Sequence, residues 1–128
     1  MDKVMMLSPA TLAFVGDAAF GLLVRTKLSE VERPIGELHK RSVDFVNANA
    51  QAEGFLLIKD ILTEKEMSIF KRGRNNHVGS IPKSATVGIY HTATGVEALF
   101  GYLHLSGENA RLNELFEIIW NGISKQNM

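Results

Sequence analysis

Two acidic residues stand alone in apolar stretches of this chain, eighty residues apart. Asp17 lies within residues 12–20, whose other members are apolar or glycine, and Glu97 lies within the largely apolar stretch 94–103. The residues one helical turn before and after each acid are small, namely Ala13, Gly21, Ala93 and Gly101. A carboxylate on an apolar helix is costly to bury unless a cation meets it, so we expect a notch beside each acid that a cationic partner occupies.

The two carboxylates could together form one divalent metal site. Carboxylate oxygens are the hard ligands that Mg²⁺ prefers, and a bound cation can activate water and neutralise developing charge. The alternative is that each acid is a partly exposed flank residue or pairs with a nearby Arg or Lys, because structural ion pairs also place lone acids on helices. The pattern alone leaves both interpretations open.

The acid-bearing stretches must be held by helices. Pro9 suits the first turn of a helix that Ser8 caps, and this helix is expected to run to about Leu28. Pairs of apolar residues recur along it at the three-and-four spacing that predicts a core-facing side: Phe14/Val15, Ala18/Ala19 and Leu22/Leu23. Asp17 falls beside this predicted side.

The next segment also has a helical pattern. Pro34 is expected as the first residue of a helix, and the pattern then continues from Ile35 to Leu62. Because 28 residues are many for one globular helix, we expect a kink or two helices that meet between Val46 and Asn49.

Three further helices follow. Thr63 and Glu66 form a capping box that begins a helix through Lys71-Arg72-Gly73-Arg74-Asn75, and residues 76–82 are expected to be a loop. Ser84 or Thr86 caps the helix that carries Glu97, Gly107 ends it, and a last helix spans about 109–123. Strand patterns are absent, so the predicted fold is an all-α helical bundle.

Composition excludes several classes of protein. The 128 residues, 45% of them hydrophobic, fit one compact domain, and the lack of cysteine excludes disulfides and thiolate metal sites. The first seven residues are too short and too polar for a signal peptide, and the sequence has no apolar run long enough to span a membrane. We therefore expect a cytoplasmic protein with no membrane partner.

The net charge is zero, but the charges are unevenly distributed. Between Glu66 and Glu97 there is no acidic residue, whereas basic residues gather there. The candidates for contacts with nucleic-acid phosphates are Lys71, Arg72, Arg74, Asn75 and Lys83. A local basic stretch is sufficient for such contacts, because binding depends on local potential; the alternative is an ordinary solvated turn.

At these motifs the chain resembles the ribonuclease III family. Phe14-Val15-Gly16-Asp17-Ala18-Ala19-Phe20 is similar to the family's signature helix, whose core reads Glu-Phe-Leu-Gly-Asp-Ser/Ala. Val96-Glu97-Ala98-Leu99-Phe100-Gly101 is similar to its second acidic motif, Thr-Val-Glu-Ala-Leu-Ile-Gly. The length is that of one catalytic domain over residues 1–128, without the double-stranded-RNA-binding domain that usually follows, which points to the short Mini-III branch. Further similarities to that branch lie at residues 38–42, 51–53 and 71–75.

The resemblance implies a ribonuclease III-like catalytic domain that hydrolyses double-stranded or structured RNA. It implies a homodimer whose two sites cut opposite strands, and maturation of the ribosomal RNA precursor (23S) as the role. Asp17 and Glu97 are then both the catalytic and the metal-binding residues, with Mg²⁺ as the cofactor and Mn²⁺ as a substitute.

The match departs from the longer family members at three acidic positions. Glutamates stand seven and four residues before the signature aspartate in those enzymes, where this chain has Ala10 and Ala13. An aspartate stands three residues before the second-motif glutamate, where this chain has Thr94. Only Asp17 and Glu97 carry over, so we expect one well-held Mg²⁺ per subunit.

Two other functions are compatible with these residues. A catalytically idle relative would bind double-stranded RNA without cutting it. A helical dimerisation or adaptor protein would not bind nucleic acid, and the acid-free basic stretch would then be accidental.

Overall fold

A computed structural model describes residues 2–76 and 86–126 of the chain. In this part of the chain the secondary structure is entirely helical, as predicted. The elements in order are the 3₁₀-helix η1 (Val4–Met6), α1 (Pro9–Leu28), α2 (Ile35–Val46), α3 (Ala48–Ile58), the 3₁₀-helix η2 (Lys59–Ile61), α4 (Glu64–Arg74), α5 (Val87–Leu105) and α6 (Asn109–Gln126). None of these helices is long and apolar enough to cross a membrane.

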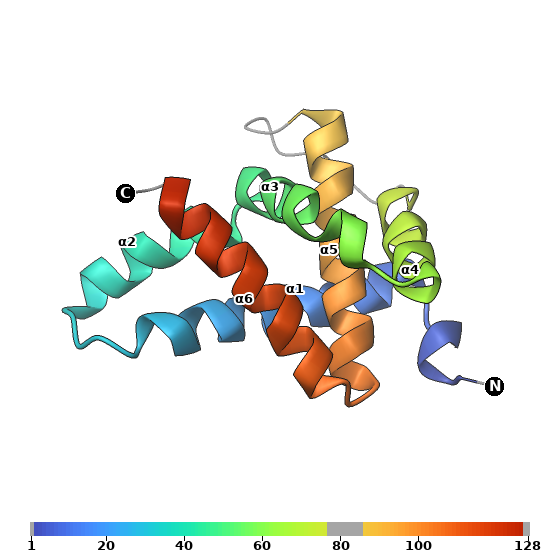
Figure 1. Ribbon diagram of the computed structural model, residues 1–128, viewed down its shortest axis with the longest axis horizontal. Helices are drawn as coiled ribbons and strands as arrows, with labels where there is room; N and C mark the ends of the chain where they lie inside the picture. The colour runs from blue at the N-terminus through green and yellow to red at the C-terminus, as the bar shows by residue number, and fades with distance from the viewer. Residues whose placement is uncertain (1, 77–85, 127–128) are drawn as a thin grey trace.

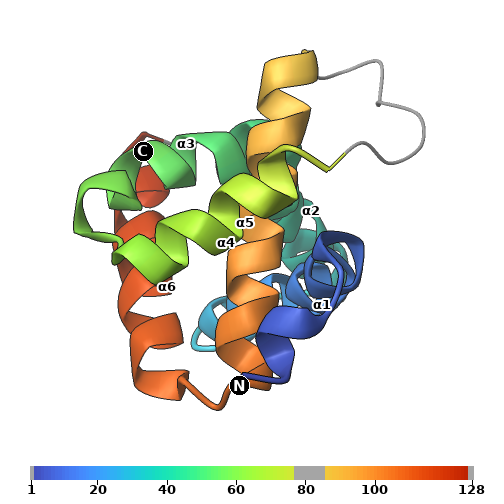
Figure 2. The ribbon, with the colours of Figure 1, turned by 90° about the vertical axis from the view of Figure 1, so that its right-hand side faces the viewer.

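Helix α5 is the centre of the bundle (Figures 1 and 2). Helices α1, α3 and α4 all pack against it, and α6 covers α3 and part of α5. Ten consecutive or near-consecutive residues of α5, from Ala93 to Leu103, are buried. Glu97, within this stretch, is the one residue that is not fully buried.

Local capping signals set most of the helix ends. The Ser8 hydroxyl accepts a hydrogen bond from the Thr11 backbone N–H at 3.1 Å and begins α1. Thr63 and Glu66 form the predicted reciprocal capping box at the start of α4. Thr86 caps α5, and Gly107 adopts the left-handed conformation (φ +72°) just after it. Ser84 and most of the predicted loop 76–82 lie outside the described residues.

The segment from Ile35 to Leu62 contains two α-helices, so of the two predicted alternatives, a kink or two helices, the second is correct. The division falls at Asn47, which leaves the helical conformation and accepts a hydrogen bond from the Ala50 N–H at 2.8 Å. The position predicted for Pro34 was wrong by one residue. Pro34 is the extended cap residue, and the helix begins at Ile35.

The predicted core-facing side of α1 was only partly right, because Ala19 is buried and Leu23 packs against the core. The buried residues are Leu12, Ala13, Gly16, Ala19, Phe20, Val24 and Leu28. Phe14 and Leu22 are instead 80% and 63% exposed. The helix is apolar on nearly all sides, so the three-and-four spacing fits more than one face and does not select the one that packs on α5.

Aromatic contacts join the ends of the bundle. Phe20 of α1 packs edge-on against Phe100 and Phe116, with ring centroids 5.3 and 5.6 Å away. Trp120 stacks on Phe45 at 4.1 Å, which docks α2 against α6. Trp120 thus takes part in the packing of α6 against α2.

Candidate active site

Helices α1 and α5 cross with their main chains in direct contact. A Cβ atom added to Gly16 would lie 1.6 Å from the Glu97 carbonyl oxygen, and one added to Gly101 would lie 1.9 Å from the Leu12 carbonyl oxygen. Real Cβ atoms do not come so close, so only glycine fits at these two positions. The notch expected at Gly101 for a cationic partner is therefore filled by the backbone of α1.

Asp17 directly follows Gly16 and is exposed. It lines an open cleft of about 380 Å³ between α1 and α2, together with Gly21, Arg25, Ser42 and Val46. A Cβ at Gly21 would meet no described atom within 4 Å, so the predicted notch is open on this side of the acid. A ligand that approaches through this cleft reaches the Asp17 carboxylate.

Glu97 is mostly buried beside Asp17 at the crossing. Burial raises the pKa of Glu97 to about 8, and the Asp17 charge and a hydrogen bond from protonated Glu97 to Asp17 add to this rise. The side-chain amide of Gln51, on α3, acts in the opposite direction. The structure thus brings the two predicted carboxylates together, and in the absence of a cation it favours a proton between them.

The alternative in which each acid pairs with a basic side chain is not seen in the described part of the chain. Neither Asp17 nor Glu97 belongs to any of the ion pairs seen among these residues. Within the same residues no group of three or more His, Cys, Asp or Glu side chains is arranged to hold a metal. Two carboxylates are therefore the side-chain ligands that this site can offer to a cation.

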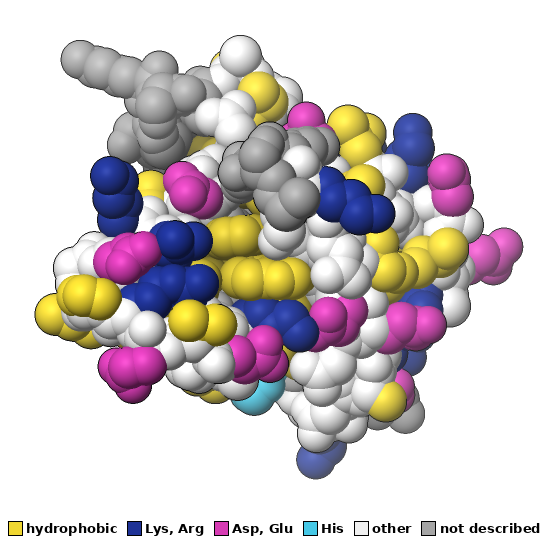
Figure 3. All heavy atoms as spheres, turned by 60° about the vertical axis from the view of Figure 1, so that its left-hand side comes forward, with side chains coloured by type: hydrophobic (Ala, Val, Ile, Leu, Met, Phe, Trp, Pro, Cys, Tyr) yellow, Lys and Arg dark blue, Asp and Glu magenta, His cyan; other side chains and the backbone are white. Residues whose placement is uncertain are grey.

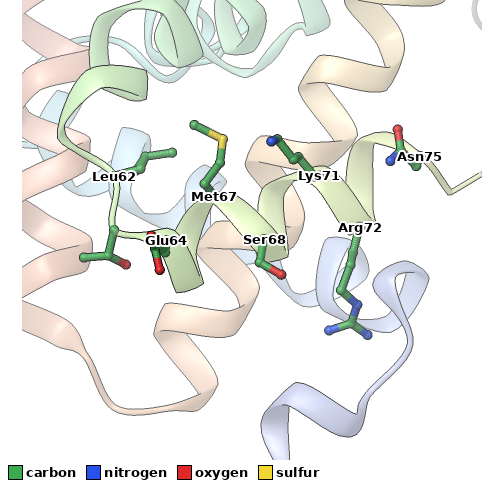
Figure 4. A pocket seen from close by; sticks show the side chains of 8 residues that line it. Leu62, Glu64, Met67, Ser68, Lys71, Arg72 and Asn75 are labelled. Carbon is green, nitrogen blue, oxygen red and sulfur yellow. The ribbon is translucent and has the colours of Figure 1, made fainter.

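Four of the five predicted phosphate-contacting residues lie at the end of α4, and none of the four lines this cleft. Lys71, Arg72 and Asn75 line a separate open cleft of about 590 Å³ along α4 (Figure 4). Lys71 and Asn75 are exposed there. Neither carboxylate lines this second cleft, so the structure does not place the acids and these residues in one pocket.

Two of the predicted basic residues have internal partners. The Arg72 guanidinium donates to the Met5 carbonyl oxygen at 3.0 Å and to the Leu7 carbonyl oxygen at 3.1 Å, which ties the N-terminal segment to α4. The Arg74 guanidinium lies 5.8 Å from the centre of the Phe70 ring. Lys83 lies outside the described residues.

One residue beside the site was missed by the sequence analysis. Gln51 is 3% exposed, and its amide lies beside Glu97. The available signal was the short motif at residues 51–53, which contributed to the family resemblance but was given no chemical role.

Comparison with known proteins now decides the family. A family model described as the ribonuclease III domain matches residues 10–108 of the chain. The chain belongs to the ribonuclease III family. Family membership makes it an endoribonuclease, as the motifs around Asp17 and Glu97 predicted.

Individual relatives place the similarity more closely within the family. The chain is 47% identical over 118 residues to Mini-ribonuclease 3 of Thermoanaerobacter sp. (strain X514), a match that covers 91% of this chain and 83% of that protein. It is 36% identical over 117 residues to Mini-ribonuclease 3 of Clostridium tetani, covering 90% and 78%. The predicted similarity to the Mini-III branch is confirmed.

A solved structure agrees with the fold. The crystal structure of a protein from Fusobacterium nucleatum matches with a TM-score of 0.87 at 30% identity, covering 95% of this chain and 98% of that one. The all-α, ribonuclease III-like architecture predicted for this family member is confirmed.

Proposed function

We propose that this member of the ribonuclease III family acts as a single catalytic domain over residues 1–128 that cleaves double-stranded RNA, with a divalent cation held by Asp17 and Glu97. The observation that carries the proposal is the meeting of two lone carboxylates where the main chains of α1 and α5 touch. The proposed substrate, by resemblance to the Mini-III branch, is the precursor of 23S ribosomal RNA in the cytoplasm.

The residues present fit a divalent cation. Two adjacent carboxylates repel each other when both are ionised, which contributes to the raised pKa of Glu97, and a cation between them removes that repulsion. Their hard oxygen atoms suit Mg²⁺, with Mn²⁺ as a substitute, and water and substrate phosphate would complete the coordination. When bound, the cation would lower the pKa of a water molecule and neutralise charge on the leaving oxygen.

The protein's own contribution is position and shielding. The glycine crossing fixes the backbones that carry both acids, and a site built on two packed helices keeps its geometry better than one built on loops. Asp17 faces the open cleft, where a phosphate could approach, while Glu97 is mostly shielded from water.

An RNA duplex is recognised through its shape, phosphates and 2′-hydroxyls. Lys71 and Asn75 are exposed on one side of α4 and are suited to backbone contacts. Arg74, beside Phe70, can contribute a further contact. The Arg72 guanidinium already donates hydrogen bonds to the N-terminal segment. Lys83 stays a candidate from sequence alone.

We also propose a homodimer. Support comes from α1, the helix that carries Asp17, where the large apolar side chains of Phe14 and Leu22 are 80% and 63% exposed. Figure 3 shows one face of the molecule, where exposed hydrophobic side chains lie among interspersed basic and acidic ones. A dimer formed through α1 would hold two active sites in a fixed relation, one for each strand of the duplex.

The test is cleavage of a labelled RNA duplex by the purified protein with Mg²⁺ or with EDTA. Wild type, Asp17→Asn, Glu97→Gln and the matched control Asp60→Asn, an exposed acid on η2, are compared. Cleavage is expected only with Mg²⁺, only in wild type and the control, and with normal folding of all four proteins.

Each alternative function predicts a different result. Binding of the duplex without cleavage at any Mg²⁺ concentration would identify an idle relative. Neither binding nor cleavage would favour a dimerisation or adaptor protein.

A further inference from the structure

The side chain of Gln51 is buried in a way that the fold alone does not explain. It is 3% exposed, and its Nε2 atom is fully buried without a hydrogen-bond partner among the described residues. Leaving a buried amide donor unpaired costs on the order of 1–3 kcal/mol, and an apolar side chain of similar size would avoid that cost.

The backbone holds Gln51 in a fixed place. The residue lies in the first turn of α3, where its N–H donates to the Asn47 carbonyl oxygen at 3.1 Å. Helix α3 is packed on both sides: Gly54 leaves room for Ile119 of α6, and Phe55 stacks on Phe70 at 3.9 Å. The Gln51 amide therefore cannot move to the surface without disturbing this packing.

The amide lies close enough to the carboxyl group of Glu97 to lower the pKa of that group, although Nε2 does not reach hydrogen-bond geometry with it. An amide nitrogen can only donate, and a carboxylate oxygen is a strong acceptor for it. The buried donor of Gln51 therefore lies next to one of the two carboxyl groups proposed to hold the cation.

We propose that Gln51 is a positioning residue of the active site, whose side-chain N–H groups hold the Glu97 carboxylate in the orientation in which it binds the divalent cation. This inference rests on the proposed function. Partners that orient metal ligands typically change metal affinity or activity by about 10–100-fold when removed, so Gln51 is expected to matter on that scale.

The test compares Gln51→Leu and Gln51→Met with wild type and with Asn49→Leu, an exposed position on the same helix that receives the same apolar side chain. Mn²⁺ affinity is measured by calorimetry, unfolding by urea without cation, and kcat and KM on an RNA duplex with Mg²⁺. Both Gln51 variants are expected to bind Mn²⁺ about 10–100-fold more weakly and to lose kcat with little change in KM.

A stability measurement separates positioning from a structural role. Without cation, the Gln51 variants are expected to unfold at the same or higher urea concentration than wild type, because an unpaired amide has been removed. Gln51→Glu keeps the size but replaces the donor with a third carboxylate, and it is expected to lose kcat as well.

The outcomes distinguish this inference from the proposed function. If wild type cleaves with Mg²⁺ and Asp17→Asn does not, but the Leu and Met variants match wild type in Mn²⁺ affinity and kcat, then Gln51 is not a positioning residue. The inference would also be overturned if the Gln51 variants lost activity only in proportion to their loss of folded protein. If wild type itself neither binds Mn²⁺ nor cleaves, the proposed function fails first.

Discussion

Replacing Gly101 with alanine tests whether the close crossing of α1 and α5 positions the carboxylates of the proposed active site. The added Cβ would lie 1.9 Å from the Leu12 carbonyl oxygen, whereas ordinary contacts begin at about 3.4 Å. The helices must therefore separate by about 1.5 Å, and backbone atoms cannot rotate away as a flexible side chain could.

The expected cost follows from this displacement. Overpacking of a well-packed interface typically costs about 1–3 kcal/mol, of which up to about 1 kcal/mol is recovered because alanine favours a helix more than glycine does. For a domain of this size each kcal/mol lowers Tm by roughly 4 °C. Activity is expected to fall further, by about 100-fold, since an error of ~1 Å in the placement of catalytic groups has effects of that size.

The assay is thermal unfolding followed by circular dichroism, together with RNA cleavage at a temperature where all proteins are folded. Gly88→Ala is the matched control, because it lies on the same helix and its Cβ would meet no described atom within 4 Å. If Gly101→Ala unfolds at the same temperature as wild type and cleaves RNA at the same rate, the helix crossing does not set the position of the carboxylates.

Three further predictions follow from exposed or titrating groups. Because the pKa of Glu97 is raised in the folded state, protonated Glu97 stabilises the cation-free protein fully below about pH 4.5, and this stabilisation is lost as the pH rises to about 8. The free energy of unfolding is expected to fall over this range by at most about 1.4 kcal/mol per pH unit. Urea unfolding at successive pH values measures this slope, which Glu97→Gln is expected to lack. Phe14→Ser is expected to weaken self-association by about 10–100-fold in sedimentation experiments, whereas Leu56→Ser, also at an exposed position, is not. Lys71→Ala is expected to weaken duplex binding and to make the slope of log K against log salt concentration shallower by about one unit. Lys125→Ala, at another exposed position, is expected to change neither quantity in a filter-binding titration.

Features that depend on neighbouring residues could be predicted from the sequence. The caps at Ser8 and Thr63 and the left-handed Gly107 are local signals, and each lies where the structure has it. The pairing of Asp17 with Glu97 was also predictable, because both stand alone in apolar helices and match the two acidic motifs of the ribonuclease III family.

Features that depend on distant contacts could not be predicted. Arg72 was assigned to RNA because it stands in a basic stretch, yet its partners are backbone carbonyls 65 and 67 residues away. The packed face of α1 depends on where α5 lies, and periodicity in a helix without a polar side carries no information on that. Burial of Gln51 depends in the same way on the docking of α3 against α5.

The glycine crossing has a consequence for how the enzyme becomes active during folding. Gly16 and Gly101 touch across 85 residues of chain, and each of the two helices carries one of the two acids, so neither α1 nor α5 can form the proposed site by itself. A partly folded chain with intact local helices would have its carboxylates far apart and would hold no cation between them. Nuclease activity would therefore require that α1 and α5 have docked against each other.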